Sequence, residues 1–414
     1  MSPDDARAVC VTGLGAISPL GANLEASWQA CFEGRSAIAP HRFDTGDYGP
    51  PPFEVPLALV AQSPEPEIER RLGRRLGTAL DPFALYALGA ATEAIAQAGL
   101  TTAMLSSAGV VFGHGSGGVH STEQGYERFY GRRTNKQHPM TVPRSMVSSP
   151  VSAIAMECGI RGPVFAVSSA CSSSGHAMIQ GAMMLRAGQA SVVLVGGSDA
   201  IATPACIAAW EGLRAMSKTT CRPFSANRDG MAIGEGGACL VLETRAHAEA
   251  RGATILAVLA GTGMSSDAFH WTQPSLEGPV SCIRQACTEA GVIDASGMLI
   301  AAHGTGTPVN DSNETKALNA VFSSRAQSHH VTATKSAHGH LIGASTALQA
   351  ALGLKSLAMH QALPILGFLG RDPECDLNLV LERPRPVETT LLLVSSFAFG
   401  GLNTSLVFRA YARQ

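Results

Sequence analysis

The sequence predicts an α/β protein built from two fused halves of similar layout that share one core. Short runs rich in β-branched and apolar residues alternate with longer segments of helical periodicity, a pattern typical of helices packed against sheets. A second series of such runs repeats the arrangement of the first. The segment between the two series, residues 245–253, is polar, helix-like and too short to be a flexible linker.

Each half contributes its own strands and helices. The first series of predicted strands is Ala8–Thr12, Gly109–Phe112, Val164–Ser168, Ser191–Val195 and Ala238–Glu243. The second series is Ile255–Leu259, Met298–His303, Val331–Thr334, Leu377–Leu381, Leu391–Ser396 and Ser405–Phe408. Helices are predicted at 82–99, 172–187, 279–291, 312–322 and 341–359. We therefore expect an N-terminal half of residues 1–248 and a C-terminal half of residues 249–414. Residues 40–66 carry two proline clusters and predict an irregular surface excursion.

Composition excludes several classes of protein. The 414 residues carry 30 Lys and Arg against 32 Asp and Glu, a formal net charge of −2, so a polycationic nucleic-acid binder is not expected. Hydrophobic residues make up 45% of the chain and charged residues only 15%. This balance favours a large core together with a self-association surface, and therefore a dimer.

Cysteine usage and the N-terminus indicate a compartment. The chain has ten cysteines but no Cys-x-x-Cys pair, and a protein of this size needs no disulfide framework. The N-terminus has neither the basic nor the apolar region of a signal peptide. No run reaches the roughly 18 apolar residues of a membrane span. We therefore expect a soluble, cytoplasmic protein with reduced thiols.

Cys171 is the leading candidate nucleophile. It lies in Ser168-Ser-Ala-Cys-Ser-Ser-Ser-Gly175, which follows a predicted strand and opens a predicted helix. Unpaired backbone N–H groups and the positive end of the helix dipole favour a thiolate at such a position. Small neighbours leave room for a carbonyl group. Most cysteines are structural, and in this setting a structural and a catalytic role are about equally expected before the rest of the chain is considered.

His303 opens a second polar segment, His303-Gly-Thr-Gly-Thr-Pro308, at the end of another predicted strand. Its glycines let a ligand approach the backbone, and the hydroxyls of Thr305 and Thr307 can bind a polar, amide-bearing tail.

Lys335, His338 and His340 form a third segment, which follows the predicted strand Val331–Thr334. A lone histidine is usually structural. Two histidines and a lysine at the carboxyl ends of strands indicate a ligand site, because such sites gather there in α/β folds.

The C-terminal segment Ser395–Asn403 contains the turn Phe399-Gly400-Gly401. It is either an ordinary hairpin corner or a mobile gate whose backbone N–H groups help to form an oxyanion hole. Two other patterns carry less weight. The loop Gly113–Gly118 lacks the spacing of a dinucleotide-binding turn. The histidines have no carboxylate or thiolate partner at ligand spacing, so no metal site is expected.

These segments, in this order, resemble the β-ketoacyl-acyl-carrier-protein synthases of the thiolase superfamily, closest to the KAS II-like group that elongates fatty acyl chains. The resemblance covers essentially the whole chain, from Val11–Gly15 to Phe397–Gly401. Other matching segments are Arg161–Pro163, Arg222–Phe224, Arg228–Gly230 and Ser265–Ala268. The resemblance implies a thiolase-like duplicated fold with the layers α-β-α-β-α. It also implies that no metal or redox cofactor is needed, because the substrates travel on the phosphopantetheine of an acyl carrier protein.

The resemblance also implies roles for individual residues. The catalytic positions are the acylated Cys171, the decarboxylation histidines His303 and His340, and Lys335, which organises them. Phe399 matches the gating phenylalanine, whose backbone N–H would join that of Cys171 in the oxyanion hole. Thr305 and Thr307 match positions that contact the pantetheine arm. The implied reaction is a decarboxylative Claisen condensation of an acyl thioester with malonyl-carrier protein, in fatty-acid or in polyene or polyketide elongation.

Residues outside this centre are implicated in substrate and carrier binding. Ser116 stands where the saturated-chain elongating synthases have a bulky aliphatic residue, which implies a longer or more polar acyl pocket. The acidic carrier protein needs a basic dock, and a predicted helix presents several arginines on one face. The docking residues implied by the resemblance are Arg71, Arg74 and Arg75, with Lys136 as an outlying contributor.

Two alternatives stay open beside the condensing enzyme. A non-catalytic partner subunit of the chain-length-factor kind keeps the fold but typically lacks the nucleophilic cysteine, which is present here as Cys171. A thiolase needs a second catalytic cysteine near the C-terminal glycine-rich loop, and residues 397–401 contain none. We therefore expect an acyltransferase that works as a homodimer or as a heterodimer with a chain-length factor.

Overall fold

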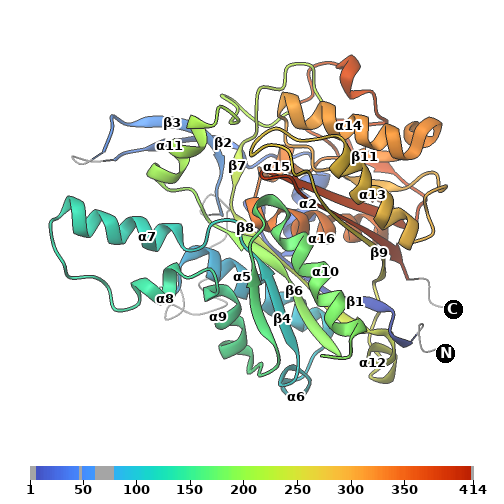
Figure 1. Ribbon diagram of the computed structural model, residues 1–414, viewed down its shortest axis with the longest axis horizontal. Coiled ribbons are helices and arrows are strands. Elements are labelled where there is room, and N and C mark those ends of the chain that lie inside the picture. Colours follow the sequence, from blue (N-terminus) through green and yellow to red (C-terminus); the bar gives the residue numbers. More distant parts are fainter. Residues whose placement is uncertain (1–5, 46–48, 61–78, 412–414) are drawn as a thin grey trace.

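The computed structural model describes residues 6–45, 49–60 and 79–411. Its centre is a ten-stranded sheet with the strand order β11-β10-β14-β15-β9-β1-β8-β6-β4-β5 (Figure 1). The strands nearer the N-terminus are β1 (Val9–Ile17), β4 (Gly109–Gly113), β5 (Val164–Val167), β6 (Val192–Asp199) and β8 (Gly236–Thr244). The others are β9 (Ala257–Ser266), β10 (Leu299–Ala301), β11 (His330–Thr332), β14 (Leu391–Ala398) and β15 (Leu402–Ala410).

The two halves of this sheet repeat one arrangement. In the first half, β4 runs parallel to β5 and β6, and the antiparallel pairs β6–β8 and β8–β1 follow. In the second half, β10 runs parallel to β11 and β14, and the antiparallel pairs β14–β15 and β15–β9 follow. The halves join where Cys10 and Val11 of β1 pair with Val258 and Ala257 of β9. This repeat confirms the predicted duplication.

Helices cover both faces of each half-sheet. On one outer side, α5 (Pro82–Ala98) packs on β1 and β8, and α9 (Ser149–Cys158) packs on β4. On the other outer side, α13 (Glu277–Glu289) packs on β9 and against α14 (Pro308–Phe322). Between the half-sheets lie α10 (Ser173–Arg186) and α16 (Ser345–Ala358), which contact each other and strands of both halves (Figure 1). The order is helix, sheet, helix, sheet, helix, as predicted.

Buried apolar residues follow these layers. The central cluster joins Ala177 and Met178 of α10 to Leu348 and Leu352 of α16. A second cluster lies beneath α5 and α9, and a third beneath α13 and α14. Burial of apolar surface on both sides of each half-sheet, at roughly 25 cal/mol per Å², therefore holds the layers together.

Smaller elements surround this body. A three-stranded sheet consists of β2 (Ala39–Phe43), β3 (Phe53–Ala58) and β7 (Ile233–Gly234), and a two-stranded one of β12 (Gln361–Ala362) and β13 (Arg385–Pro386). The remaining α-helices of the described residues are α2 (Leu24–Phe32), α6 (Thr102–Leu105), α7 (Val119–Tyr126), α8 (Thr141–Ser145), α11 (Pro204–Gly212), α12 (Arg245–Ala250) and α15 (Lys335–His338). The sequence predicts an irregular excursion for residues 40–66. The described part of this region is instead regular, because it contributes the antiparallel pair β2–β3.

One predicted strand, Leu377–Leu381, is wrong. Leu379 and Leu381 form isolated bridges to Val331 and Ile365, but no continuous ladder develops. Leu377 and Leu379 are buried in the cluster beneath α14. Their apolar pattern therefore reflects burial of a coil segment and not strand pairing. The proposed boundary between residues 248 and 249 falls within α12, and the division into two domains stays a prediction.

Candidate active site

Ends of strands from both halves meet around one cavity of about 370 Å³. Cys171 follows β5, His303 follows β10, His340 follows β11, and Phe399 follows β14. All four line the cavity, and Thr305 and Thr307 line it as well. The structure thus brings together most of the site residues predicted from sequence.

Cys171 is held in a tight turn at the start of α10. It lies in the 3₁₀ turn Ala170–Ser172, which leads into the helix, and Ala170 has a φ of 51°. The carbonyl of Cys171 accepts hydrogen bonds from Ser396 Oγ at 3.0 Å and from Thr346 Oγ1 at 3.4 Å. These bonds anchor the nucleophile to β14 and α16, so its position depends on the C-terminal half.

The Cys171 thiol is more basic than the sequence predicts. Burial raises its pKa to about 11, and nearby Asp199 adds to the rise. Lys335 and the backbone N–H groups of Phe399 and Cys171 itself lower the pKa, but burial dominates. The predicted thiolate at the helix terminus is therefore wrong for the resting site. The backbone N–H groups of Phe399 and Cys171 are nevertheless close enough to favour negative charge on the sulfur.

The proton of His340 can be assigned from its neighbours. Its Nδ1 accepts a hydrogen bond from the backbone N–H of Ile342 at 3.0 Å, with Ser345 Oγ at 2.9 Å. A nitrogen that accepts from a backbone N–H carries no proton, so Nε2 carries it in the neutral ring. Among the described residues Nε2 has no partner, although it is buried. His340 thus has an uncommitted N–H donor.

The proton of His303 can be assigned in the same way. Lys335 Nζ and Ser396 Oγ lie 3.4 Å from its Nδ1. An ammonium group can only donate, which makes Nδ1 the acceptor and Nε2 the protonated nitrogen. The rings of His303 and His340 lie 5.5 Å apart at 87°. Both rings line the same cavity, which therefore has two imidazole N–H donors.

Both histidines are neutral at physiological pH. Burial lowers the pKa of His303 and of His340 well below 6.5, and the charge of Lys335 adds to the effect. Desolvation is the larger of the two causes. A neutral ring is what a hydrogen-bond donor to a developing enolate requires.

Lys335 lies behind the histidines and does not line the cavity. Its Nζ donates to the His303 carbonyl at 2.6 Å and to Gln349 Oε1 at 2.9 Å. Burial lowers its pKa to about 8, while Glu314 acts in the opposite direction. This geometry suits a residue that organises His303 and does not touch substrate.

Glu314 was not anticipated from the sequence. Its carboxylate accepts hydrogen bonds from the backbone N–H groups of His303 and Gly304, at 2.7 and 2.8 Å. It is only 1% exposed, and burial raises its pKa to about 7. The available signal was a glutamate three residues after Asp311 on the apolar side of the predicted helix 312–322. Ser396 and Gln349, likewise missed, carry no comparable sequence signal.

The loop after β14 covers one side of the cavity. Gly400 and Gly401 have φ values of 81° and 71°, which favour glycine. The Phe399 ring stacks on Trp210 of α11 with centroids 6.1 Å apart at 24°. Gly400 N donates to the carbonyl of Trp271 at 2.8 Å, which ties the loop to a second segment at the mouth. A phenylalanine that stacks on Trp210 and is followed by two glycines suits the predicted gate.

Thr305 and Thr307 lie at the cavity wall between His303 and α14. Their hydroxyls are 2.9 Å apart, and Thr307 Oγ1 accepts a hydrogen bond from Asn310 N as the N-cap of α14. Neighbouring hydroxyls of this kind can bind amides and carbonyls of a flexible arm.

The remaining predicted site residues lie elsewhere. Ser116 is exposed and does not line the cavity. The imidazole of His338 pairs with Thr334 Oγ1 and the Gly339 carbonyl at 2.9 and 2.8 Å, and it too lies outside the cavity lining. Lys136 is exposed on the connection between α7 and α8. Arg71, Arg74 and Arg75 lie outside the described residues. The roles predicted for these positions stay predictions.

The described residues contain neither a candidate metal site nor a candidate membrane-spanning helix. No group of three or more His, Cys, Asp or Glu side chains among them could hold a metal ion. No helix in the described part of the chain combines the length and apolar character needed to cross a membrane.

Comparison with known proteins gives the family. A model described as the N-terminal domain of beta-ketoacyl synthase matches residues 6–248, and one described as its C-terminal domain matches residues 256–368. Nodulation protein E of Rhizobium meliloti (strain 1021) is 37% identical over 97% of this chain and 99% of its own length. The 3-oxoacyl-[acyl-carrier-protein] synthase 2 of Staphylococcus aureus (strain COL) is 32% identical over 98% of this chain and 99% of its own length.

Solved structures agree. The ishigamide ketosynthase/chain length factor superimposes with a TM-score of 0.89 and 30% identity, covering 98% of this chain and 100% of its own. This similarity confirms the predicted thiolase-like fold. The matches extend across both halves of the sheet and across the cavity between them, and so this chain belongs to the β-ketoacyl synthase family of condensing acyltransferases.

Proposed function

We propose that this chain catalyses the decarboxylative Claisen condensation of an acyl thioester with a malonyl thioester, through an acyl-Cys171 intermediate. The observation that carries the proposal is the meeting of one buried thiol with two neutral imidazoles in a single cavity. A thiol supplies the nucleophile of acyl transfer, and paired N–H donors supply stabilisation for an enolate.

In the first half-reaction, Cys171 Sγ attacks the thioester carbonyl and the carrier thiol leaves with the proton that the cysteine loses. The backbone N–H groups of Cys171 and Phe399 favour negative charge near the sulfur, and they are our candidates for the oxyanion hole. Because the resting thiol has a pKa of about 11, the proton is lost as the attack proceeds and not beforehand.

In the second half-reaction, a malonyl thioester binds and loses CO₂. The Nε2–H groups of His303 and His340 donate to the enolate oxygen that develops. The enolate carbon then attacks the acyl-Cys171 carbonyl, the Cys171 thiolate leaves, and it takes up a proton. The product is a 3-oxoacyl thioester longer by two carbons. Thr305 and Thr307 would hold the phosphopantetheine arm of either substrate.

The partners follow from the relatives' names. One relative is a synthase acting on acyl carrier protein, and one structural neighbour is a ketosynthase/chain length factor pair. We infer that this chain also takes its substrates from an acyl carrier protein in the cytoplasm and pairs with a second ketosynthase-like chain. In this reading Lys136, with Arg71, Arg74 and Arg75, contributes to the basic dock, and Ser116 contributes to the acyl pocket.

The alternative is a non-catalytic subunit that shapes the pocket of a partner. Such a subunit has no need of Cys171, His303, Lys335 and His340 together, and the first three of these are joined here through Ser396 and direct contacts. This connected arrangement favours the catalytic reading.

The test is intact-protein mass spectrometry after incubation with acyl-carrier proteins of different chain length, followed by peptide mapping. An acyl adduct on Cys171, discharged to a 3-oxoacyl product by malonyl-carrier protein, is the expected result. Absence of any adduct, even when a chain-length-factor partner is supplied, would support the non-catalytic subunit. Cys31→Ala, which changes a buried cysteine of α2, is the matched control and should acylate normally.

A further inference from the structure

The loop carrying Thr305 and Thr307 is held from behind by its carbonyl groups. The carbonyl of Thr305 accepts a hydrogen bond from Cys221 Sγ at 3.2 Å. The next carbonyl, of Gly306, accepts from Gly230 N at 3.0 Å. Both bonds fix the backbone of the loop while the two threonines remain at the cavity wall.

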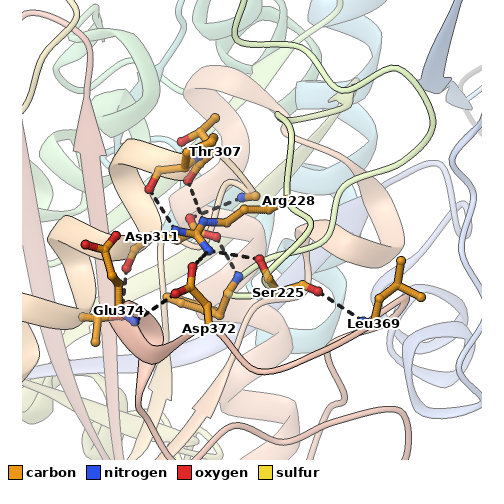
Figure 2. A network of polar contacts seen from close by, with 11 residues as sticks. Ser225, Arg228, Thr307, Asp311, Leu369, Asp372 and Glu374 are labelled. Carbon is orange, nitrogen blue, oxygen red and sulfur yellow. Dashed lines mark hydrogen bonds and ion pairs between the residues drawn. The ribbon is translucent and has the colours of Figure 1, made fainter.

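Arg228 holds the following two carbonyls. Its Nε donates to the Thr307 carbonyl at 3.3 Å, and its Nη2 donates to the Pro308 carbonyl at 3.1 Å (Figure 2). Its Nη1 donates to the Ser225 carbonyl at 3.0 Å and to Asp372 Oδ2. The planar guanidinium therefore connects the threonine loop to two other segments in one fixed geometry.

Asp372 is itself oriented by its own segment. Its second oxygen, Oδ1, accepts a hydrogen bond from Glu374 N at 2.9 Å (Figure 2). The same segment donates from Leu369 N to Ser225 Oγ at 3.1 Å. Residues 369–375 follow the range that matches the family's C-terminal domain, which ends at 368.

Asp311 completes the support from the side of α14. Its buried carboxylate accepts hydrogen bonds from Phe224 N at 2.7 Å and from Gly306 N at 3.3 Å. The amide of Gly306 thus donates a hydrogen bond to Asp311. The carbonyl groups of the loop accept hydrogen bonds from Cys221, Gly230 and Arg228.

We propose that the ion pair Arg228–Asp372 is a positioning element for the phosphopantetheine arm. It does not touch substrate, but it sets the backbone from which the Thr305 and Thr307 hydroxyls reach the arm. The inference rests on the proposed function, because it assumes that the cavity binds that arm. The side chain of Arg228 is 4% exposed and that of Asp372 is 18% exposed, so the guanidinium is buried while the carboxylate keeps part of its contact with solvent.

The test compares substrates with and without the arm. Asp372→Asn keeps the size of the side chain but removes the charge that orients Arg228. We expect a rise of about tenfold in KM for acyl-phosphopantetheine thioesters, the typical effect of losing one charge-assisted hydrogen bond. The concentration of phosphopantetheine that protects Cys171 from iodoacetamide by half should rise equally. The kcat, and the rate of alkylation without phosphopantetheine, should stay within about twofold of wild type because iodoacetamide carries no arm.

Two further variants make the result unambiguous. Arg228→Lys keeps the charge but cannot reach both carbonyls and the carboxylate, so it should raise KM by an intermediate factor. Asp294→Asn, which breaks the exposed ion pair with Arg325, is the matched control and should change nothing.

The outcomes separate the inference from the proposed function. A wild-type protein that is never acylated would overturn the proposed function, and this inference with it. A wild-type protein that condenses normally, beside an Asp372→Asn variant with unchanged KM and protection, would overturn only the inference. A parallel fall in kcat, alkylation and melting temperature, or failure of both variants to fold, would mark the pair as a structural support and also overturn it.

Discussion

The two halves of the sheet share one strand order but supply different chemistry. In the first half, the edge strand β5 leads through a turn into α10, and Cys171 occupies that turn. In the second half, the edge strand β11 leads through α15 and a turn into α16, and Lys335 and His340 occupy the corresponding stretch. Equivalent positions therefore carry the proposed nucleophile in one half, and Lys335 with the proposed enolate donor His340 in the other.

A second pair of equivalent strands shows the same division. The loop after β4 is held by Asp199, whose carboxylate accepts hydrogen bonds from Gly115 N at 2.7 Å and from Ser116 N at 3.3 Å. The loop after β10 is held by Glu314 in the manner already described. Both halves thus fix a glycine-containing loop with a buried carboxylate, and each loop carries a buried histidine, His114 or His303, but only His303 lines the cavity. The fold was duplicated, and the site depends on where the copies differ.

The largest effect is expected from removing the proposed nucleophile, which the first half contributes. Cys171→Ala should lower acylation and condensation by at least about 10³-fold, because no other cysteine is found among the described residues that line the cavity. Malonyl decarboxylation should persist, since its donors belong to the second half. Mass spectrometry for the adduct, with CO₂ release measured in parallel, checks both statements. Condensation at the wild-type rate would contradict the mechanism.

Removing a hydrogen-bond donor from the second half should affect decarboxylation and not acylation. His303→Ala should still allow acylation of Cys171 but should slow malonyl decarboxylation by about 10²- to 10³-fold, the usual cost of one lost donor to an oxyanion. Single-turnover CO₂ release from preformed acyl-enzyme measures this step alone. If acylation and decarboxylation fell together, the two halves would not divide the chemistry as proposed.

The pH dependence of alkylation sharpens the contrast between the thiol and the imidazoles. Below its pKa of about 11 the Cys171 thiol is protonated, so each unit of rising pH should increase iodoacetamide labelling about tenfold, or about a hundredfold from pH 7 to 9. His303 and His340 stay neutral throughout this range and should not bend the profile. Lys335, with a pKa of about 8, loses charge within it, which should make the slope slightly shallower at the upper end. A plateau below pH 8 would mean that the thiolate is stabilised more than burial allows.

The sequence was sufficient for the fold and for residues whose local pattern is distinctive. Alternating strands and helices predicted the duplicated α/β architecture, and strand–turn–helix context identified Cys171, His303 and His340. The segment 377–381 was misread because a buried coil can have the same apolar pattern as a strand. The thiol's basicity was misjudged because burial of Cys171 arises from packing between halves, which no local pattern contains.

Contacts between distant segments explain what the sequence could not supply. Ser396 reaches Cys171 across 225 positions, and Arg228 reaches Asp372 across 144. Such partners are brought together only by the completed fold. Glu314 is an intermediate case, because a carboxylate on the apolar side of a predicted helix signals a buried partner without naming it.

The smallest effect that still separates the halves comes from the two buried carboxylates. Glu314→Gln keeps one acceptor for His303 N or Gly304 N but removes the charge that raises the pKa of Lys335, so the orientation of His303 should loosen. We expect malonyl decarboxylation to fall by about tenfold, the value of one charge-assisted hydrogen bond. Asp199→Asn is the corresponding change in the first half. Asp199 also accepts a hydrogen bond from Gly343 N at 2.7 Å, three residues after His340, so decarboxylation should fall as well, but by less than in Glu314→Gln. Equal losses in the two variants would mean that Glu314 has no special role in orienting His303 and that the two carboxylates support the site alike.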